Sequence, residues 1–322
     1  MYRYHDSVIR AALSVFLPFV CLIVCFARPA SSNSSYAGEF LALGAGARAV
    51  ALGGAYTAIV DDATAGYWNA AALTNIRERQ AHTMHSKRFG GLVEHSFLAL
   101  AIPAKRIDGL AVSIMRVGVG NLKFTQLPNP NRSPGPNNRP QVSSVETSSD
   151  YAFYMSGGHR LSPRLSVGVS AKLVYRTISG FNAYGLGLDL ALRYKLKEGL
   201  RFGLNCRDVT TTLIFWSTDT TDTIRPSVVA GLSYAKAIGS GRATTSFGSR
   251  MGGQAADESG ANPLNLGVEY AHGKIALRIG REEGRQAFGL GLVPHERIEF
   301  DLAYLDHDEL ESTYQVSLGF RY

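Results

Sequence analysis

The stretch Gly44-Ala-Gly46-Ala-Arg-Ala49 matches the G-x-G-x-x-G/A fingerprint of a dinucleotide-binding loop. In such a loop the glycines let the backbone approach a pyrophosphate, and the following helix N-terminus binds its negative charge. Asp61 or Asp62 would then be the acid that contacts the ribose. The fingerprint has this meaning only between a strand and an unbroken helix of a parallel βαβ unit, so the surrounding elements decide its chemistry.

Those elements are not found around the fingerprint. Gly53-Gly54 stands where the helix should continue, and no strand-helix-strand repeat follows. We therefore expect no nucleotide and no other cofactor. Small side chains allow close backbone packing, so we expect the Ala- and Gly-rich residues 33–78 to form a plug, or hatch, inside a barrel or across its mouth. Asp61-Asp62 is expected to end a helix or form a turn, with a ligand contact as the alternative.

The rest of the chain shows no residue pattern typical of a catalytic or metal-binding site. His82 and His85 are three residues apart on a predicted strand, so they point to opposite faces and cannot chelate one ion. Asp301, His307 and the scattered serines form no nucleophile elbow. The formal net charge of +7 comes without a run of Lys and Arg, which argues against a nucleic-acid partner. We predict that the protein is not an enzyme.

The first residues have the order of a secretory signal. Basic residues precede an apolar run over residues 11–27, and small residues follow it. We expect residues 1–32 to be removed, by cleavage after Ala27 or after Ser32. A retained membrane anchor is the alternative, although the run is short for a span of about 20 residues and Pro18 interrupts it.

Period-2 alternation dominates the rest of the chain. Residues 184–194 place tyrosine and leucine on one face, and glycine, alanine, Asp189 and Arg193 on the other. Ten steps of about 3.3 Å, tilted by about 40°, give roughly 25 Å of height, which matches the apolar band of a membrane barrel. The pattern predicts an all-β fold, an antiparallel transmembrane β-barrel of 14 strands over residues 79–322. The expected strands are 79–87, 91–103, 108–118, 148–160, 163–177, 182–196, 199–207, 224–236, 241–250, 263–272, 273–281, 284–293, 295–305 and 312–322.

The connections support a barrel of the bacterial outer membrane. Alternate turns are short, and the long connections 119–147, 208–223 and 251–262 all fall at the other end, as in barrels with short periplasmic turns and long external loops. The longest connection holds five of the twelve prolines, so we expect no regular structure in it. A soluble β-sandwich also alternates, but its outer face should be polar, whereas here the polar face is sparse and rich in glycine.

Charged residues of both signs share the predicted lumen face. This mixture suggests a polar network that holds the plug to the wall, with a selective path for ions or polar solutes as the alternative. The residues are Lys172, Arg176, Asp189, Arg193, Glu269, Arg278, Glu299, Asp301 and Arg321.

The segment from Gly46 to Leu73 resembles the amino-terminal signature of the PorV/PorQ family, which is similar to the FadL group of long-chain fatty acid transporters. The likeness extends to the carboxyl end, where aromatic Phe320 and Tyr322 resemble the signal read by the barrel-assembly machinery. The family usually has Trp-Asn-Pro-Ala where this chain has Ala70 in place of proline, which puts a rigid turn there in doubt. The motif residues are Gly46, Arg48, Gly53, Gly54, Tyr56, Asp61, Asp62, Trp68 and Asn69.

The resemblance implies an outer-membrane barrel with an amino-terminal hatch and offers two functions. In the first, the barrel is an accessory of type IX protein secretion and binds cargo or partner proteins; the polar external loops favour this expectation. In the second, it passes small hydrophobic molecules across the outer membrane, as FadL does. A passive pore is a third alternative. The expected partners are outer-membrane lipid, the assembly machinery, secretion proteins or cargo, or a small hydrophobic ligand.

Overall fold

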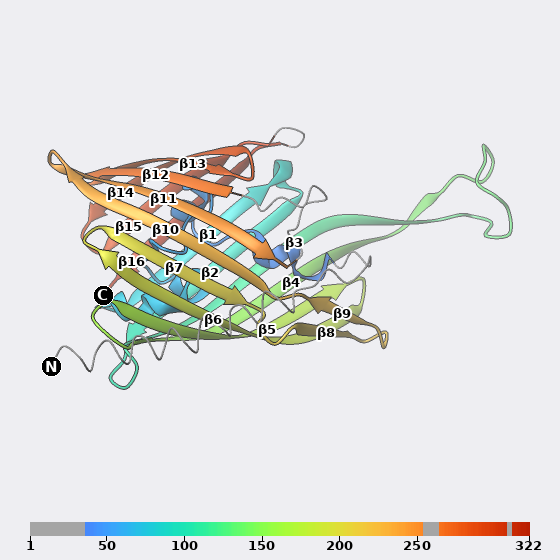
Figure 1. The fold of residues 1–322 in the computed structure, drawn as a ribbon. Coiled ribbons are helices and arrows are strands. Elements are labelled where there is room, and N and C mark those ends of the chain that lie inside the picture. The colour runs from blue at the N-terminus through green and yellow to red at the C-terminus, as the bar shows by residue number, and fades with distance from the viewer. Residues whose placement is uncertain (1–35, 254–263, 308–310) are drawn as a thin grey trace.

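The chain forms a closed antiparallel barrel of 14 strands, β1–β7 and β10–β16, with two further strands attached to it (Figure 1). The computed structural model describes residues 36–253, 264–307 and 311–322, so the expected signal peptide lies outside the described residues. The barrel closes because β5 pairs with both β4 and β6. Its first seven strands are β1 Gln80–Arg88, β2 Val93–Pro103, β3 Gly109–Gln126, β4 Gln141–Arg160, β5 Leu165–Ile178, β6 Phe181–Lys197 and β7 Leu200–Arg207. The other seven are β10 Ser227–Ile238, β11 Gly241–Gly252, β12 Leu264–His272, β13 Ile275–Glu282, β14 Arg285–His295, β15 Ile298–Leu305 and β16 Thr313–Arg321.

The fourteen predicted strands are confirmed, but two of the predicted loops are wrong. Connection 119–147 is mostly strand: β3 and β4 stay paired out to Gln126 and Gln141, and their hairpin projects beyond the barrel (Figure 1). The prolines gather in 127–140 and leave the flanking residues free to pair. Connection 208–223 contains β8 (Thr212–Trp216), which pairs with β6, and β9 (Thr221–Ile224), because threonine and aromatic residues suit an extended chain.

The outer face of the barrel is apolar and carries aromatic rows near one end. Leu186 on β6 and Met155 on β4 are 73% and 68% exposed. On three adjacent strands, Tyr151, Tyr175 and Tyr184 stand side by side, with ring centroids 6.0 and 4.9 Å apart. Phe288, Tyr304 and Tyr314 form a second row on β14–β16. Such rows mark the level where an apolar belt meets the membrane surface.

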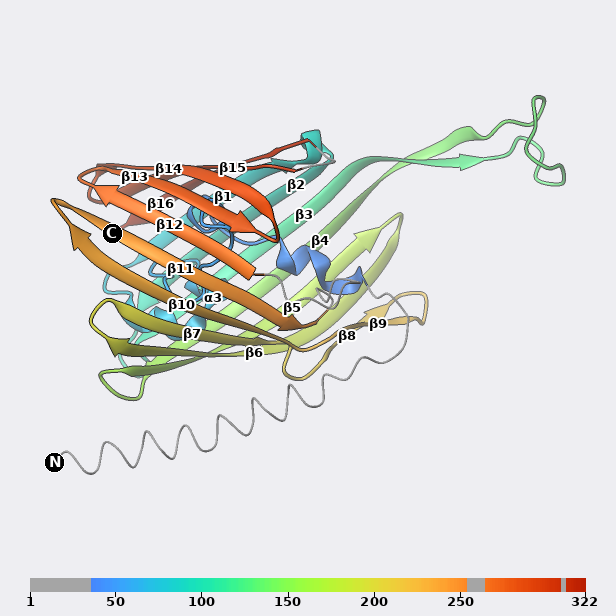
Figure 2. The same cartoon turned by 45° about the horizontal axis from the view of Figure 1, so that its top comes forward.

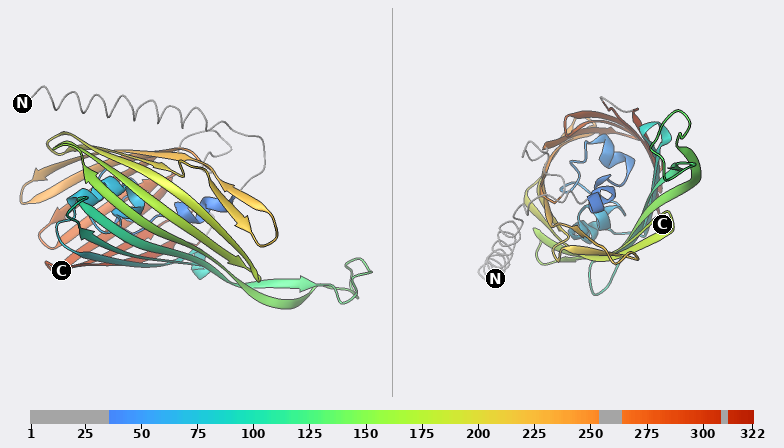
Figure 3. Two further views of the ribbon diagram at one scale, coloured as in Figure 1. Left: turned by 90° about the horizontal axis from the view of Figure 1, so that it is seen from below. Right: turned by 90° about the vertical axis from the view of Figure 1, so that its right-hand side faces the viewer.

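Residues 36–78, here called the inner segment, lie inside the barrel (Figure 3). Helix α2 packs on β13–β16, α3 packs on β3 and β4, and η2 packs on β4–β6. At the end with the longer connections, which we call external, η1 contacts β9 (Figure 2). The helices are η1 Tyr36–Ala42, α2 Ala47–Ala51, α3 Ala65–Trp68 and η2 Ala70–Asn75, with η3 Phe89–Gly91 in the β1–β2 turn. The described part of the chain has no helix long and apolar enough to cross a membrane.

Candidate functional site

The start of α2 is fastened to the barrel wall. Gly46 precedes the helix with φ at +89°, a conformation that favours glycine. Its amide donates to the Met84 sulfur at 3.1 Å, and the amide of Ala47 donates to Ser317 Oγ at 2.7 Å. A nucleotide pyrophosphate would need these same amides, and α2 is only five residues long. The geometry therefore favours a structural role for the fingerprint.

Glycines on the lumen face of the wall let the inner segment approach the wall backbone. A Cβ built on Gly280 would lie 2.3 Å from the amide nitrogen of Gly53, and one built on Gly53 would lie 2.4 Å from the Arg281 carbonyl oxygen. Cβ atoms essentially never come this close, so both positions require glycine. The other wall glycines in such contact are Gly109, Gly158, Gly168, Gly203, Gly267 and Gly289. The alternating pattern places glycine on this face but gives no sign of this contact.

Arg48 joins the inner segment to a charged network on the wall. Its Nε and Nη2 donate to both carboxylate oxygens of Glu269, at 2.8 and 2.9 Å, and its Nη1 donates to Asp61 at 2.7 Å. Glu269 also accepts from Arg278, which bonds Asp301 in turn. A bidentate Arg–carboxylate pair fixes the orientation of the two side chains as well as the distance between them. The mixed-sign lumen network expected from the sequence thus includes a direct link to the inner segment.

Asp62 holds a turn within the inner segment. One of its oxygens accepts the Tyr56 hydroxyl at 2.8 Å, and the other accepts the Thr64 amide at 2.7 Å. Burial alone would raise the pKa of the Asp62 carboxyl, but nearby His82 and Arg48 and these hydrogen bonds together lower it below its usual value. The carboxylate is therefore charged at neutral pH. This geometry agrees with the expectation that Asp61-Asp62 forms a turn.

Aromatic residues anchor the middle of the inner segment. The Trp68 indole donates to the Ala45 carbonyl at 2.7 Å, and the Tyr67 ring lies 4.9 Å from the Arg207 guanidinium of β7. Asn69 Nδ2 donates to the Leu192 carbonyl on β6 at 3.1 Å.

The turn at Ala70 is present without the family's proline. Asn69 precedes it in an extended conformation, with φ at −167° and ψ at 96°, and its side-chain oxygen accepts the amide of Ala71 at 3.1 Å. Ala70 is then the first residue of η2, a position that suits proline. The Asn69 cap supplies the rigidity that the missing proline placed in doubt.

A second charged network lies nearer the external end. Lys172 on β5 is buried and contacts Asp189 on β6 and Asp208, each at 2.8 Å. Asp208 also accepts the Thr212 hydroxyl of β8 at 2.6 Å. This network ties the β8–β9 hairpin to the wall. Lys172 and Asp189 are predicted lumen residues, whereas Asp208 follows a strand and has no period-2 signal that would reveal it.

The remaining predicted lumen residues fall into three environments. Arg176 pairs with Asp150 of β4 at 2.8 Å and donates to the Ala37 carbonyl of η1. Glu299 pairs with Arg321 at 3.1 Å near the periplasmic end, where Arg321 is exposed. Arg193 is buried on β6 and lines a chamber described below. Aromatic Phe320 and Tyr322, the expected assembly signal, are exposed at the end of β16.

The histidines lie as the strand parity predicts. His82 is buried in the lumen and His85 is exposed on the opposite face. In the part of the chain that the structure describes, no group of three His, Cys, Asp or Glu side chains is placed to hold a metal ion. Cys206 is buried in β7 and has no disulfide partner among the described residues.

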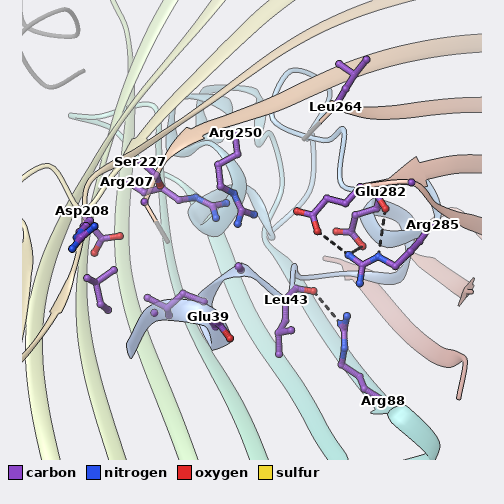
Figure 4. Close-up of a pocket in the computed structure, with 18 of the residues that line it drawn as sticks. Glu39, Leu43, Arg88, Arg207, Asp208, Ser227, Arg250, Leu264, Glu282 and Arg285 are labelled. Carbon is purple, nitrogen blue, oxygen red and sulfur yellow. Dashed lines mark hydrogen bonds and ion pairs between the residues drawn. The ribbon is translucent and has the colours of Figure 1, made fainter. Parts of the chain in front are cut away.

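The inner segment lies between two chambers. The external chamber, of about 680 Å³, is floored by η1 and the residues that follow it (Figure 4). Leu41, Leu43 and Ile224 give it an apolar side. Charged residues line the rest, where Arg88 donates to the Leu43 carbonyl at 3.2 Å and Arg285 pairs with acidic residues of the β13–β14 turn. The periplasmic chamber, of about 740 Å³, has eight arginine and lysine residues in its lining.

Comparison with known proteins gives matches in fold but not in sequence family. No protein-family model matches the chain, and no curated protein does. The deltaS2S3 mutant of the monoaromatic hydrocarbon channel TodX has a TM-score of 0.55 at 12% identity, covering 87% of this chain and 99% of that chain. The toluene transporter TodX of Pseudomonas putida has a TM-score of 0.53 at 13% identity, covering 86% and 96%. The chain has the fold of a bacterial outer-membrane β-barrel.

The fold comparison supports one of the two family resemblances noted in the sequence, the FadL-like one, and does not test the other, PorV/PorQ. The FadL-like resemblance is supported at the level of fold alone, because TodX shares the barrel architecture. The PorV/PorQ resemblance stays a prediction, since no comparison bears on protein secretion. The exposed apolar belt and its aromatic rows are what such a barrel presents to lipid.

Proposed function

We propose that the protein transports small hydrophobic molecules across the bacterial outer membrane, with the inner segment as its hatch. The observation that carries the proposal is the external chamber, which is partly apolar and has the inner segment as its floor. The hydrocarbon-channel fold of TodX adds support. A molecule entering the chamber from outside would contact Leu41 and Leu43 on the floor.

The chamber suits a small ligand better than a long chain held at full length. Its volume of about 680 Å³ is in the range of small-molecule pockets. An apolar side would bind hydrocarbon, while Arg285 and the acidic residues of the β13–β14 turn on the charged side already pair with one another. Passage to the periplasm then requires the inner segment to move or the ligand to pass beside it, because that segment lies between the two chambers.

Toluene uptake by intact cells tests the proposal. Cells that lack other hydrocarbon channels should accumulate radiolabelled toluene faster when they express this protein. Leu43→Gln removes apolar contact worth about 1 kcal/mol, which predicts a roughly fivefold lower uptake rate at low toluene concentration. The matched control is Leu92→Gln, at a 68% exposed position of the β1–β2 turn outside the chamber. Equal uptake with and without the protein would contradict the proposal.

Two other functions remain as predictions with separate tests. For secretion, the protruding β3–β4 hairpin exposes Phe124, Val142 and Val145, a surface that a protein partner could cover. Normal secretion in a deletion strain would argue against that role. A passive pore predicts large steady conductance in planar bilayers, whereas the hatch proposal predicts low conductance for the wild-type protein.

A further inference from the structure

We propose that the periplasmic chamber binds a phosphate group, carried either by a free ion or by a lipid headgroup. The chamber lies at the short-turn end of the barrel, below the inner segment, and is separate from the external chamber. The inference does not depend on hydrocarbon transport, because it uses none of the residues of the external chamber.

The lining of the chamber carries a large excess of positive charge. Eight arginine and lysine side chains line it, against two carboxylates. Both carboxylates already have cationic partners: Asp61 pairs with Arg48 at 2.7 Å, and Glu198 pairs with Lys195 at 3.0 Å. Arg48 is itself bound to Glu269, so within the described part of the chain most of the chamber's cations have no ion-pair partner.

Arg193 is the deepest of these cations. It is 8% exposed, and its Nη1 has no hydrogen-bond partner among the described residues. The nearby Arg201 and Arg160 repel it, and Asp61, which attracts it, is engaged by Arg48. Burying a guanidinium without a counter-charge is costly, so an anion held in the chamber beside Arg193 would offset part of that penalty through its charge.

Strand register places further donors around Arg193. On β6, Arg193 and Lys195 are two residues apart and so lie on the same, lumen-facing side of the strand. Arg201 on β7 is the register partner of Lys195. The glycine opposite Arg193 on β7, Gly203, is covered by the backbone of Thr57 and Ala58, so the open space lies beside Lys195 and Arg201, which line the chamber with Arg193. The paired N–H groups of a guanidinium match the geometry of phosphate oxygens. Several arginine side chains around one chamber therefore favour a multivalent anion over chloride.

Binding to the purified full chain in nonionic detergent tests the site. The two probes are inorganic pyrophosphate and dihexanoyl-phosphatidylglycerol kept below its micelle concentration, both measured by calorimetry. We expect saturable binding that weakens as sodium chloride rises from low to high concentration. The probe that binds more tightly identifies the source of the phosphate group, and competition between the two shows that they share one site.

Variants locate the binding site within the chamber. Arg193→Gln should weaken binding about tenfold or more, the effect of losing a charge-assisted hydrogen bond. The matched control is Lys274→Gln, at the same end of the barrel but outside the chamber, and it should bind as the wild type does. Because Arg193→Gln removes an unpaired buried charge, it should fold at least as well as the wild type in probe-free buffer.

Stability gives a second measurement on the same proteins. Saturating probe should raise the unfolding temperature of the wild type and of Lys274→Gln, but not that of Arg193→Gln. Arg201→Gln, at a more exposed position of the chamber, is the second variant and should lose part of the affinity. The proposal is overturned if neither probe binds, or if Arg193→Gln and Arg201→Gln bind both probes like the wild type. A failure of toluene uptake would leave it unaffected.

Discussion

Adding one methyl group to the wall at Gly280 should loosen the inner segment. The Cβ of Gly280→Ala would lie 2.3 Å from the Gly53 amide nitrogen, whereas ordinary contact begins at 3.4 Å. The two backbones must therefore separate by about 1 Å, and overpacking of this kind costs about 1–3 kcal/mol. The contact cannot relax by a side-chain rotation, because both partners are backbone.

Alanine also reduces the freedom of the unfolded chain, which stabilises a strand by about 0.5–1 kcal/mol relative to glycine. Gly120→Ala is the control for that effect, because a Cβ there has only Thr147 Cγ2 within 4 Å, at 3.9 Å. The difference between the two variants isolates the packing cost. We expect Gly280→Ala to be less stable than Gly120→Ala by about 1–3 kcal/mol.

Urea unfolding in detergent, followed by tryptophan fluorescence, measures this difference. One of the two tryptophans, Trp68, lies in the inner segment, so its emission should also report a displaced segment in the folded barrel. The reasoning is refuted if Gly280→Ala and Gly120→Ala have the same free energy of unfolding and the same native emission spectrum.

Three further variants test other contacts of the inner segment and the wall. Gly53→Leu combines a φ of +61° with the close contact to the wall, so the native barrel should lose its heat-modifiable band on gels. Lys172→Met leaves two buried carboxylates without their cation and should cost about 3–5 kcal/mol in urea unfolding, where a loss below 1 kcal/mol would contradict the network. Ala70→Pro should stay within about 1 kcal/mol of the wild type, because the preceding backbone is already extended; misfolding would show that proline does not fit there.

The barrel could be predicted from the sequence because its signal is local. Alternation over residues 184–194 specifies both the strand and the face that each side chain occupies. Even the weakly alternating stretch 241–250 forms a strand, because β10 and β12 pair with it on both sides. Strand β8 could not be found in this way, since its pairing with the end of β6 is set by tertiary contact and its five residues are too short for a clear pattern.

The candidate site was predictable only in part, because it depends on distant contacts. The alternation of side chains along each strand placed Lys172 and Asp189 in the lumen. No local sequence feature shows that Lys172 also contacts Asp208. The Arg48–Glu269 bond joins residues 221 positions apart, and no alternation or motif signals such a partner. Likewise, the sequence shows glycines on the lumen face without showing which of them touch the backbone of another segment.

The path of the inner segment limits the order in which the barrel can assemble. The segment begins at the external mouth with η1 and joins β1 at the opposite end, so it runs the length of the cylinder. Threading it into a finished cylinder would require its folded helices to pass wall glycines that leave no clearance. Wrapping the strands around it avoids that step. The final pairing of β1 with β16 would then close the barrel around a segment already in place. The inner segment would thus act as a template around which the strands assemble.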